Sequence, residues 1–578
     1  MTVKYLANHK NSRNILRIAP ALSGWVLTAT IATATPPPAR LRFELSFPAS
    51  VRAEAADGRV FVIVTRKADP EPRLQIGKSG GQYDSTPFFG EDVEGLKAGA
   101  QAVVDGRAIG YPLERLADLP AGDYFVQGFL NVYTTFHRAD GHVVKMHMDQ
   151  WEGQDFPLSP GNLYSAPRKI HLDPAAADTV RLVLDHKIPP IAMPADTAWV
   201  KHVRFQSPLL SQFWGQPIFI GATILLPKDY DRDSGVSYPV NYEQGHFSTD
   251  PPGGFTEKAE EGALGAAATE RQKERARRRA DFSQTWQSGE MPRMLFVTFQ
   301  HPTPYYDDSY AIDSPNMGPY GQALTQELIP YIEKHFRAIP KPWARILSGG
   351  STGGWESLAL QIFYPDYFGG TFSYCPDPVD FHYFELVNIY EWDNAWYRKD
   401  EWRKTPISAQ RQPDGLVLST MKEQLAYERA MGTGGRSGED WDCWQAVYGP
   451  VGANGLFQPL FDPATGAIDH GVAAYWKEHT DLNAYLQRHW KDIGGKLAGK
   501  IHIWTGDMDT YYLNDAMHLL DDSLKTTTNP PWGGSITFGP REPHCWVGPF
   551  ALNERLKMMA QYVAATAPRD ADRPWWRE

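Results

Sequence analysis

Hydrophobic and polar positions follow two different patterns along the chain. Between Leu41 and Leu184, short apolar runs are separated by Gly, Pro and Asp, and no helical period links them. Runs of this kind are typical of strands joined by turns, so this part of the chain predicts an antiparallel β-sandwich. The clearest expected strands are residues 41–47, 60–65, 123–132 and 142–148. We assign residues 40–190 to this accessory β domain, and the Pro-rich stretch 187–194 to the linker after it.

The second pattern, over residues 195–567, alternates strands with helices. Leu324, Leu328, Ile329 and Ile332 recur at helical spacing, between apolar runs that are short enough to be strands. Such alternation predicts an α/β domain, with a mostly parallel sheet and helices on both faces. The expected strands are residues 217–226, 240–243, 293–299, 345–347, 500–504 and 535–538.

The alternation stops between residues 376 and 488, where Trp and Tyr are frequent. We interpret this stretch as an insertion over the edge of the sheet formed by the carboxyl ends of its strands, where such sheets bind ligands. Aromatic side chains give large contact areas at low entropic cost. The substrate-binding candidates are Phe247, Tyr390, Trp392, Trp396, Trp444 and Trp546.

Composition narrows the classes of protein. The 578 residues include 57 basic and 68 acidic side chains, and the net charge of −11 argues against a nucleic-acid partner. Three cysteines exclude both a disulfide framework and a Cys-rich metal site. The 19 Trp, 27 Tyr and 27 Phe fit an aromatic-walled cleft or a large buried core, and composition does not separate the two.

The N-terminus has the pattern of a secretory signal peptide. A basic start precedes a mostly apolar stretch, 18–31, and the A-x-A sequence Ala32-Thr33-Ala34 follows. We therefore expect residues 1–34 to be a signal peptide and the protein to be exported, either to a periplasm or to the outside. No other segment reaches the length of a membrane helix, so we expect no membrane span.

The sequence G-x-S-x-G occurs twice, around Ser79 and around Ser351. A catalytic serine of this type needs a strand, a sharp turn and then a helix, so that its hydroxyl projects from the sheet. Ser351 follows the expected strand 345–347 and precedes an amphipathic helical run, whereas Ser79 precedes a loop. Ser351 is therefore the predicted nucleophile.

A serine hydroxyl needs a base, and the base needs an acid to orient it. In the α/β-hydrolase order the acid follows a late strand and the histidine follows the last one. His544 and Asp509 occupy these positions, with Asp507 as the alternative acid. The Asp-x-Asp pair lacks a third ligand at calcium-loop spacing, so we expect no metal there. We also expect no cofactor.

An oxyanion hole needs two backbone N–H groups that point at the developing charge. Thr352, directly after the nucleophile, should supply one of them. The other should come from the loop after the strand 240–243. Our choice there is His246, with Phe247 as the alternative, because Gly245 allows a sharp turn.

Several stretches together resemble one family. They are residues 224–230, 238–240, 316–321, 327–332, 348–354, 506–509 and 543–546. Over about 200–567 the chain is similar to the esterase branch of the α/β-hydrolases, which groups esterase D, S-formylglutathione hydrolases, feruloyl esterases and the catalytic domain of enterochelin esterases. The resemblance implies an ester substrate and the triad Ser351, Asp509 and His544. Gln244-Gly245 stands where that family usually has His-Gly.

These observations predict an exported serine esterase that acts on a small-molecule or carbohydrate-linked ester through an acyl-enzyme. A peptidase or an acyltransferase could use the same triad. A non-catalytic protein that binds carbohydrate or peptide is the alternative outside enzymes. It would not need Ser, Asp and His at three correctly ordered strand ends.

The cysteines leave a further question open. Cys375, Cys443 and Cys545 allow at most one internal disulfide, with Cys375–Cys443 and Cys443–Cys545 as the pairings considered. We favour three buried thiols, because free cysteine is among the most buried residue types.

Overall fold

The structure, a computed structural model, describes residues 40–77, 85–258, 269–400 and 402–576. The expected signal peptide and the second G-x-S-x-G serine, Ser79, lie outside the described residues, so their interpretation stays a prediction.

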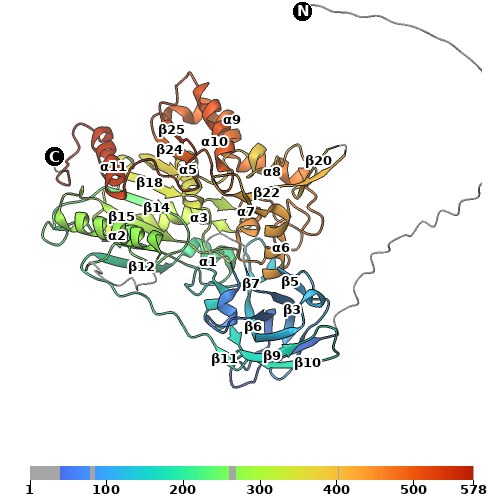
Figure 1. Cartoon of the computed structure of the whole chain (residues 1–578). Coiled ribbons are helices and arrows are strands. Elements are labelled where there is room, and N and C mark those ends of the chain that lie inside the picture. Colours follow the sequence, from blue (N-terminus) through green and yellow to red (C-terminus); the bar gives the residue numbers. More distant parts are fainter. Residues whose placement is uncertain (1–39, 78–84, 259–268, 401, 577–578) are drawn as a thin grey trace, which may run out of the picture. The chain divides into compact units, whose positions relative to one another are not determined.

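An eight-stranded sheet organises the C-terminal part of the chain (Figure 1). The first two strands run antiparallel to their neighbours, and all the others pair in parallel. The exchange of the third and fourth strands and the antiparallel second strand are features of the α/β-hydrolase fold. In spatial order the strands are β12 (Val200–Gln206), β13 (Phe219–Leu225), β15 (Leu295–Gln300), β14 (Val240–Gln244), β18 (Arg345–Gly350), β19 (Gly370–Tyr374), β24 (Ile501–Gly506) and β25 (Ser535–Gly539).

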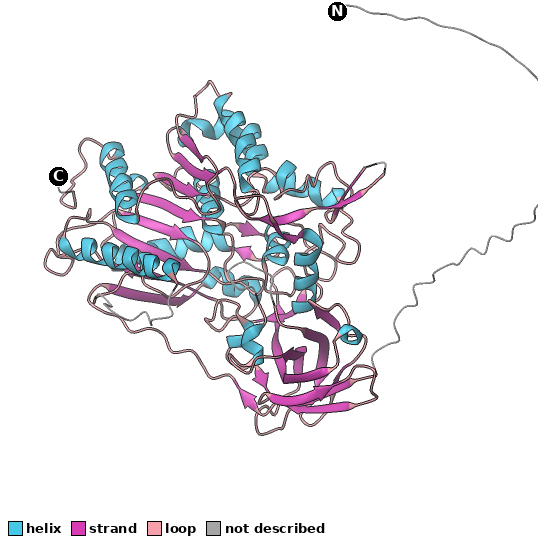
Figure 2. Ribbon diagram, viewed as in Figure 1, coloured by secondary structure: helices cyan, strands magenta, loops and turns pink. Residues whose placement is uncertain are grey.

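Helices cover both faces of this sheet, as the alternating pattern predicts (Figure 2). Phe372 of β19 packs against Tyr562 of α11 (Leu552–Thr566), while the next residue, Ser373, donates a hydrogen bond to Gly354 of α5 (Thr352–Phe363). Successive side chains of a strand point to opposite faces, so α5 and α11 lie on opposite sides. Asn553 of α11 binds Asp281 of α2 (Glu270–Ser288), which places α2 on the α11 side. The remaining helices of this part are α1 (Pro208–Trp214), α3 (Tyr320–Gln322), α4 (Ile329–His335) and α10 (Leu513–Lys525).

The helix predicted from the spacing of Leu324, Leu328, Ile329 and Ile332 contains a π-helical segment, Ala323–Leu328, between α3 and α4. All three pieces bury apolar side chains in the main core, including Leu324, Leu328 and Ile332. The apolar spacing thus indicated a helix, but it did not distinguish a continuous α-helix from one with a π-helical segment.

Residues 42–187 form two β-sheets. A three-stranded sheet has the order β10-β1-β4, and a larger one is built around β2 and β6. All pairs are antiparallel except β1 with β10. The strands are β1 (Arg42–Ser46), β2 (Ala56–Thr65), β3 (Phe88–Leu96), β4 (Ala102–Val104), β5 (Ile109–Tyr111), β6 (Gly122–His137), β7 (Val143–His147), β8 (Leu163–Tyr164), β9 (Arg168–Leu172), β10 (Thr179–Val183) and β11 (His186–Lys187). No helix or strand occurs between β11 and β12.

The stretch 376–488 carries more regular structure than its sequence pattern indicates. Its elements are the hairpins β20 (Tyr397–Lys399) with β21 (Lys404–Pro406) and β22 (Ser408–Arg411) with β23 (Val417–Thr420), followed by α6 (Met421–Met431), α7 (Asp440–Tyr448), α8 (His470–His479) and the start of α9 (Leu482–Leu497). Tyr427 of α6 packs edge-on against Phe88 and Tyr111 of the β region, so the two parts share a buried cluster.

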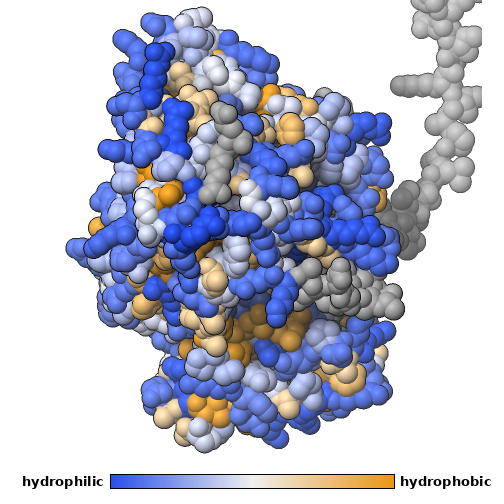
Figure 3. All heavy atoms as spheres, turned by 90° about the vertical axis from the view of Figure 1, so that its left-hand side faces the viewer, coloured by the Kyte–Doolittle hydropathy of each residue, from blue (hydrophilic) through white to orange (hydrophobic). Residues whose placement is uncertain are grey.

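The described helices include none that is both long enough and apolar enough to cross a membrane. The face shown in Figure 3 is mostly hydrophilic, with hydrophobic residues in smaller groups between the polar ones.

Candidate active site

Ser351 lies on the sharp turn between β18 and α5, in the middle of the sheet. Its backbone angles, φ 58° and ψ −125°, are ones that residues with a side chain rarely adopt, and such strain is common at functional positions. The flanking glycines are required by close packing: a Cβ on Gly349 would lie 2.2 Å from the Gly353 carbonyl oxygen, and one on Gly353 would lie 2.0 Å from that of Gln244. The turn therefore needs small residues on both sides of the serine.

Ser351, His544 and Asp509 form a hydrogen-bonded chain across three strand ends. Ser351 Oγ lies 2.9 Å from His544 Nε2, and His544 Nδ1 lies 2.7 Å from Asp509 Oδ2. Asp509 follows β24 and is fully buried, while His544 lies in the loop between β25 and α11. Because a carboxylate only accepts, Nδ1 carries the proton and Nε2 is free to accept from the serine hydroxyl.

The two aspartates that follow β24 have different partners. Asp507 Oδ1 lies 3.1 Å from Nε2 of His518 in α10. Arg411, the last residue of β22, donates from Nε to the Asp509 carbonyl oxygen at 2.9 Å and from Nη2 to Asn514 at 3.1 Å. The insertion therefore supports the loop that holds Asp509, a role that the sequence did not indicate.

The two predicted oxyanion donors lie at the ends of neighbouring strands. Thr352 is the first residue of α5, where backbone N–H groups have no partner within the helix. His246 follows β14, and its imidazole Nδ1 lies 3.2 Å from Asp307 and 3.5 Å from Asp308. Desolvation lowers the pKa of His246, but the two carboxylates raise it more, to well above its usual value. A charged imidazole would therefore anchor this loop.

A buried polar cluster that sequence reasoning missed lies beneath this loop. Asp308 and Glu356 are both almost completely buried, and burial raises the pKa of Asp308 to about 7 and that of Glu356 well above its usual value. His301 Nδ1 accepts from the Ser309 backbone N–H, so its proton is on Nε2, which lies 3.8 Å from Glu356. Because Glu356 of α5 is far in the sequence from His301 and Asp308 in the loop after β15, no spacing in the sequence could reveal the cluster.

Asp377, also missed, lies beside the nucleophile. Its Oδ1 is 3.4 Å from Ser351 Oγ, and its Oδ2 accepts from Thr352 Oγ1 at 3.2 Å and from Tyr310 at 2.5 Å. Burial raises the pKa of Asp377 to about 6, against the opposing effect of the Tyr310 hydrogen bond. The signal available in the sequence was its position in the loop that follows β19, the strand next to the one that ends at the nucleophile.

The six aromatic candidates are found in different surroundings. Trp444 is buried and donates to the Tyr310 hydroxyl, so it reaches Ser351 through Tyr310 and Asp377. The others have contacts of their own: Tyr390 with Asp481, Trp392 with Arg398, Trp396 with Lys422, Phe247 with Trp151, and Trp546 with Gly539. Of the six, Trp444 alone is linked to the nucleophile by described hydrogen bonds.

A cavity of about 350 Å³ lies next to the His246 anchor. The β region, the loop after β15 and the insertion all contribute to its wall, including Asp155, Tyr306, Asp307 and Glu439. Burial raises the pKa of Asp155 to about 6. Three acidic side chains in this wall, one of them in contact with His246, give the cavity a polar character.

The cysteines differ from the expectation of three buried thiols. Cys375 and Cys443 are buried, but Cys545 is exposed, and all three are free. The sulfur atoms of Cys375 and Cys545 and a His544 ring nitrogen lie within 4.8 Å of one another. Neither pairing considered from the sequence joins Cys375 to Cys545. The fold places these two residues side by side, because the segment that follows β19 lies next to the loop that follows β25.

Two groups of side chains have the donor types that bind metals, namely Cys375, His544 and Cys545, and His246, Asp307 and Asp308. In the first group both His544 nitrogens already bind Ser351 and Asp509. In the second, Nδ1 of His246 contacts both carboxylates. Hydrogen bonds within the protein thus account for both arrangements.

The arrangement as a whole is that of a serine hydrolase with the α/β-hydrolase fold. A strained serine at the end of a central strand contacts an imidazole that a buried carboxylate orients, which is the arrangement that activates a hydroxyl for attack on a carbonyl.

Comparison with known proteins agrees with this class. Residues 219–426 match the family described as "Putative esterase". This match agrees with a carboxylesterase-like serine hydrolase. No curated protein matches the chain.

Solved structures with related architecture are distant in sequence. A ferulic acid esterase is 16% identical, with 63% of this chain and 99% of that chain covered and a TM-score of 0.35. An S-formylglutathione hydrolase from Agrobacterium tumefaciens is 13% identical (64% and 98% covered, TM-score 0.33), and Mycobacterium tuberculosis MPT51 is 13% identical (65% and 99% covered, TM-score 0.31). We draw no conclusion about substrate from these similarities.

Proposed function

We propose that this protein is an exported serine esterase that hydrolyses small-molecule carboxylic esters through an acyl-enzyme on Ser351. The observation that carries the proposal is the hydrogen-bonded chain Ser351–His544–Asp509, with distances of 2.9 Å and 2.7 Å. Export rests on the signal-peptide pattern of residues 1–34 alone.

In the proposed first step, His544 Nε2 takes the proton of Ser351 as its oxygen attacks the ester carbonyl. Asp509 holds the Nδ1 proton and stabilises the imidazolium that forms. The backbone N–H groups of Thr352 and His246 would bind the developing oxyanion. His544 then donates its proton to the leaving alcohol, and in the second half it activates water against the acyl-enzyme.

His544 must be neutral to act as a base. Burial lowers the pKa of His544, but the negative charges of Asp509 and Cys545 have the larger, opposite effect. The pKa of His544 is therefore well above its usual value. The rate should therefore fall as the pH decreases through this raised pKa, which places the acidic limb of the kcat/KM profile above the range of an ordinary histidine.

We further propose that the β region serves as an accessory domain that contributes to substrate binding. The support is the cavity of about 350 Å³, which both the β region and the insertion line and which reaches Asp307, the partner of His246. A group attached to the ester on that side would contact residues of the β region.

The test is a panel of p-nitrophenyl, feruloyl and acetyl-sugar esters assayed beside peptide amides. We expect hydrolysis of at least one ester class with a burst of alcohol release, because acylation and deacylation are separate steps. Cleavage of the amides with no ester turned over would instead indicate a peptidase.

A further inference from the structure

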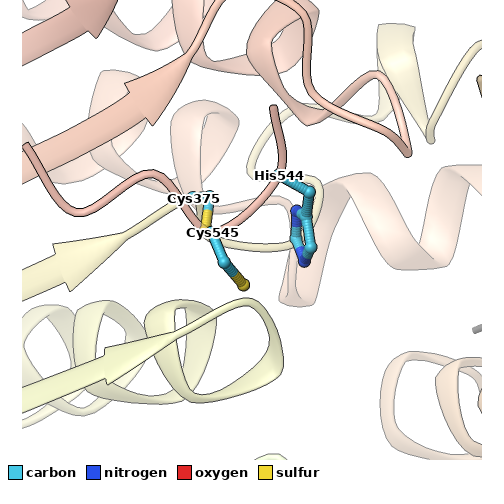
Figure 4. A group of neighbouring side chains, drawn as sticks. All are labelled: Cys375, His544 and Cys545. Carbon is cyan, nitrogen blue, oxygen red and sulfur yellow. The ribbon is translucent and has the colours of Figure 1, made fainter. Parts of the chain in front are cut away.

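Two cysteine thiols meet beside His544 (Figure 4). Cys375 directly follows β19 and is fully buried, whereas Cys545 directly follows His544 and is exposed. Their sulfur atoms lie within 4.8 Å of each other. Both residues have left-handed backbone angles, with φ 37° for Cys375 and φ 60° for Cys545, and such strain is common at functional positions.

The two members of the pair differ in backbone support and in reactivity. The Cys375 backbone N–H donates to Trp504 of β24 at 2.7 Å, so its position is fixed by the sheet. Cys545 lies in the loop between β25 and α11, which contains no helix or strand. The hydrogen bond from Cys375 and the charge of His544 hold the pKa of Cys545 well below its usual value, and a thiolate is the form of cysteine that attacks a disulfide.

We propose that Cys375 and Cys545 are a thiol-modification site that reacts with one molecule of an external disulfide and closes to a Cys375–Cys545 bond. In the first step the Cys545 thiolate attacks one sulfur of RS–SR, the S–S bond breaks, and RS⁻ leaves. In the second step Cys375 gives its proton to that RS⁻ and attacks the Cys545 sulfur, which releases the second RS⁻. Starting from the Cys545 thiolate and the Cys375 thiol, the protein loses two electrons and one proton, and the external disulfide is reduced to one thiol, RSH, and one thiolate, RS⁻, which takes its proton from water.

The consequence for turnover rests on the proposed function. Closing the bond shortens the sulfur–sulfur separation to about 2.05 Å. Because the sheet holds Cys375, the Cys545 loop must move, and it carries His544 away from its contacts with Ser351 and Asp509. Misplacement of a catalytic group by about 1 Å can cost roughly 10²-fold in rate. The oxidised protein should therefore lose about that much of its kcat and regain it with dithiothreitol.

Dithiodipyridine tests the chemistry directly, because each thiol that reacts releases a coloured thiopyridone. The native full-length protein should release two thiopyridones for each reagent molecule consumed, retain no thiopyridyl adduct, and give a Cys375–Cys545 peptide on mapping. Cys375→Ser should release one thiopyridone and retain an adduct on Cys545. Release of one equivalent with a stable adduct from the wild type, or of none, would overturn the proposal.

Cys443→Ser is the matched control, because Cys443 is a buried thiol of the insertion outside the pair. Cys443→Ser should release two thiopyridones for each reagent molecule consumed and lose ester turnover on oxidation, as the wild type does. Cys375→Ser should release only one for each reagent molecule consumed, even with excess reagent. Full ester turnover by the oxidised wild type would refute the coupling to His544. Thiopyridone release is counted without any ester, so it distinguishes a failure of the thiol pair from a failure of the proposed function.

Discussion

Two regions of the molecule differ in how their residues contribute to the site. One is the edge of the sheet where the strands carrying Ser351, Asp509 and His544 end, and the other is the insertion 376–488. At the sheet edge, the proposed mechanism assigns the chemistry to three side chains: Ser351, Asp509 and His544 each follow a strand and form one hydrogen-bonded chain. In the insertion, many aromatic side chains pack on each other, such as Trp441 on Trp444 and Phe384 on Trp476. The residues of 376–488 that reach the site are instead mainly polar, namely Asp377 and Arg411.

This difference shows where sequence patterns are informative. A strand end places a residue through topology, so local signals locate it well. A helical insertion places its residues through packing with distant segments, and an aromatic-rich composition indicates a core as readily as a binding wall. The following predictions test whether chemistry belongs to the sheet edge and support to the insertion.

The largest effect should come from Ser351→Ala, which removes the proposed nucleophile. We expect a loss of about 10⁶-fold in ester turnover, the scale seen when such a nucleophile is ablated. Circular dichroism and thermal unfolding should match the wild type. Retention of more than a small fraction of the activity in a purified variant would move the chemistry away from the sheet edge.

Asp509→Asn should follow, with roughly a 10⁴-fold loss of kcat, because the amide no longer holds the imidazole in the required tautomer. Asp507→Asn is the matched control. Its partner is His518, 3.1 Å away, so we expect little change. The opposite ranking of the two variants would assign the triad acid to Asp507.

Arg411→Ala tests support from the insertion. Loss of the 2.9 Å contact with the Asp509 carbonyl oxygen should let the acid loop shift, and kcat should fall by up to about 10²-fold, with a smaller change in KM. Arg398→Ala, an exposed arginine on β20 of the same insertion, should leave kcat unchanged. Equal kinetics for both variants would show that the insertion does not position the acid.

The smallest effect should come from Trp444→Phe, which keeps a ring but removes the donor to Tyr310. We expect a change of a few-fold in relative kcat/KM across the ester panel, since a single neutral hydrogen bond contributes about 1 kcal/mol. Trp396→Phe, whose ring packs by Lys422, should leave the relative rates unchanged. A larger change for Trp396 than for Trp444 would contradict the assignment of contacts within the insertion.

Much of the fold could be predicted from the sequence, because alternating apolar runs and a strand–turn–helix around Ser351 are local signals. The Ser351–His544–Asp509 contacts were predicted for the same reason. The helices of the insertion were missed, because its dense aromatics obscure helical spacing. Asp377, Glu356 and the Cys375–Cys545 pair were missed because each depends on contacts between residues far apart in the chain. Domain boundaries, export and the roles of the site residues remain predictions.

The central claim is that Ser351 is the nucleophile at the sheet edge, and fluorophosphonate labelling followed by peptide mapping tests it most directly. The strained serine beside His544 should be phosphonylated at Ser351 with loss of ester turnover in proportion to labelling. Asp509→Asn should be labelled far more slowly than Asp507→Asn. Stoichiometric labelling at another residue, or full turnover by protein labelled at Ser351, would contradict the account.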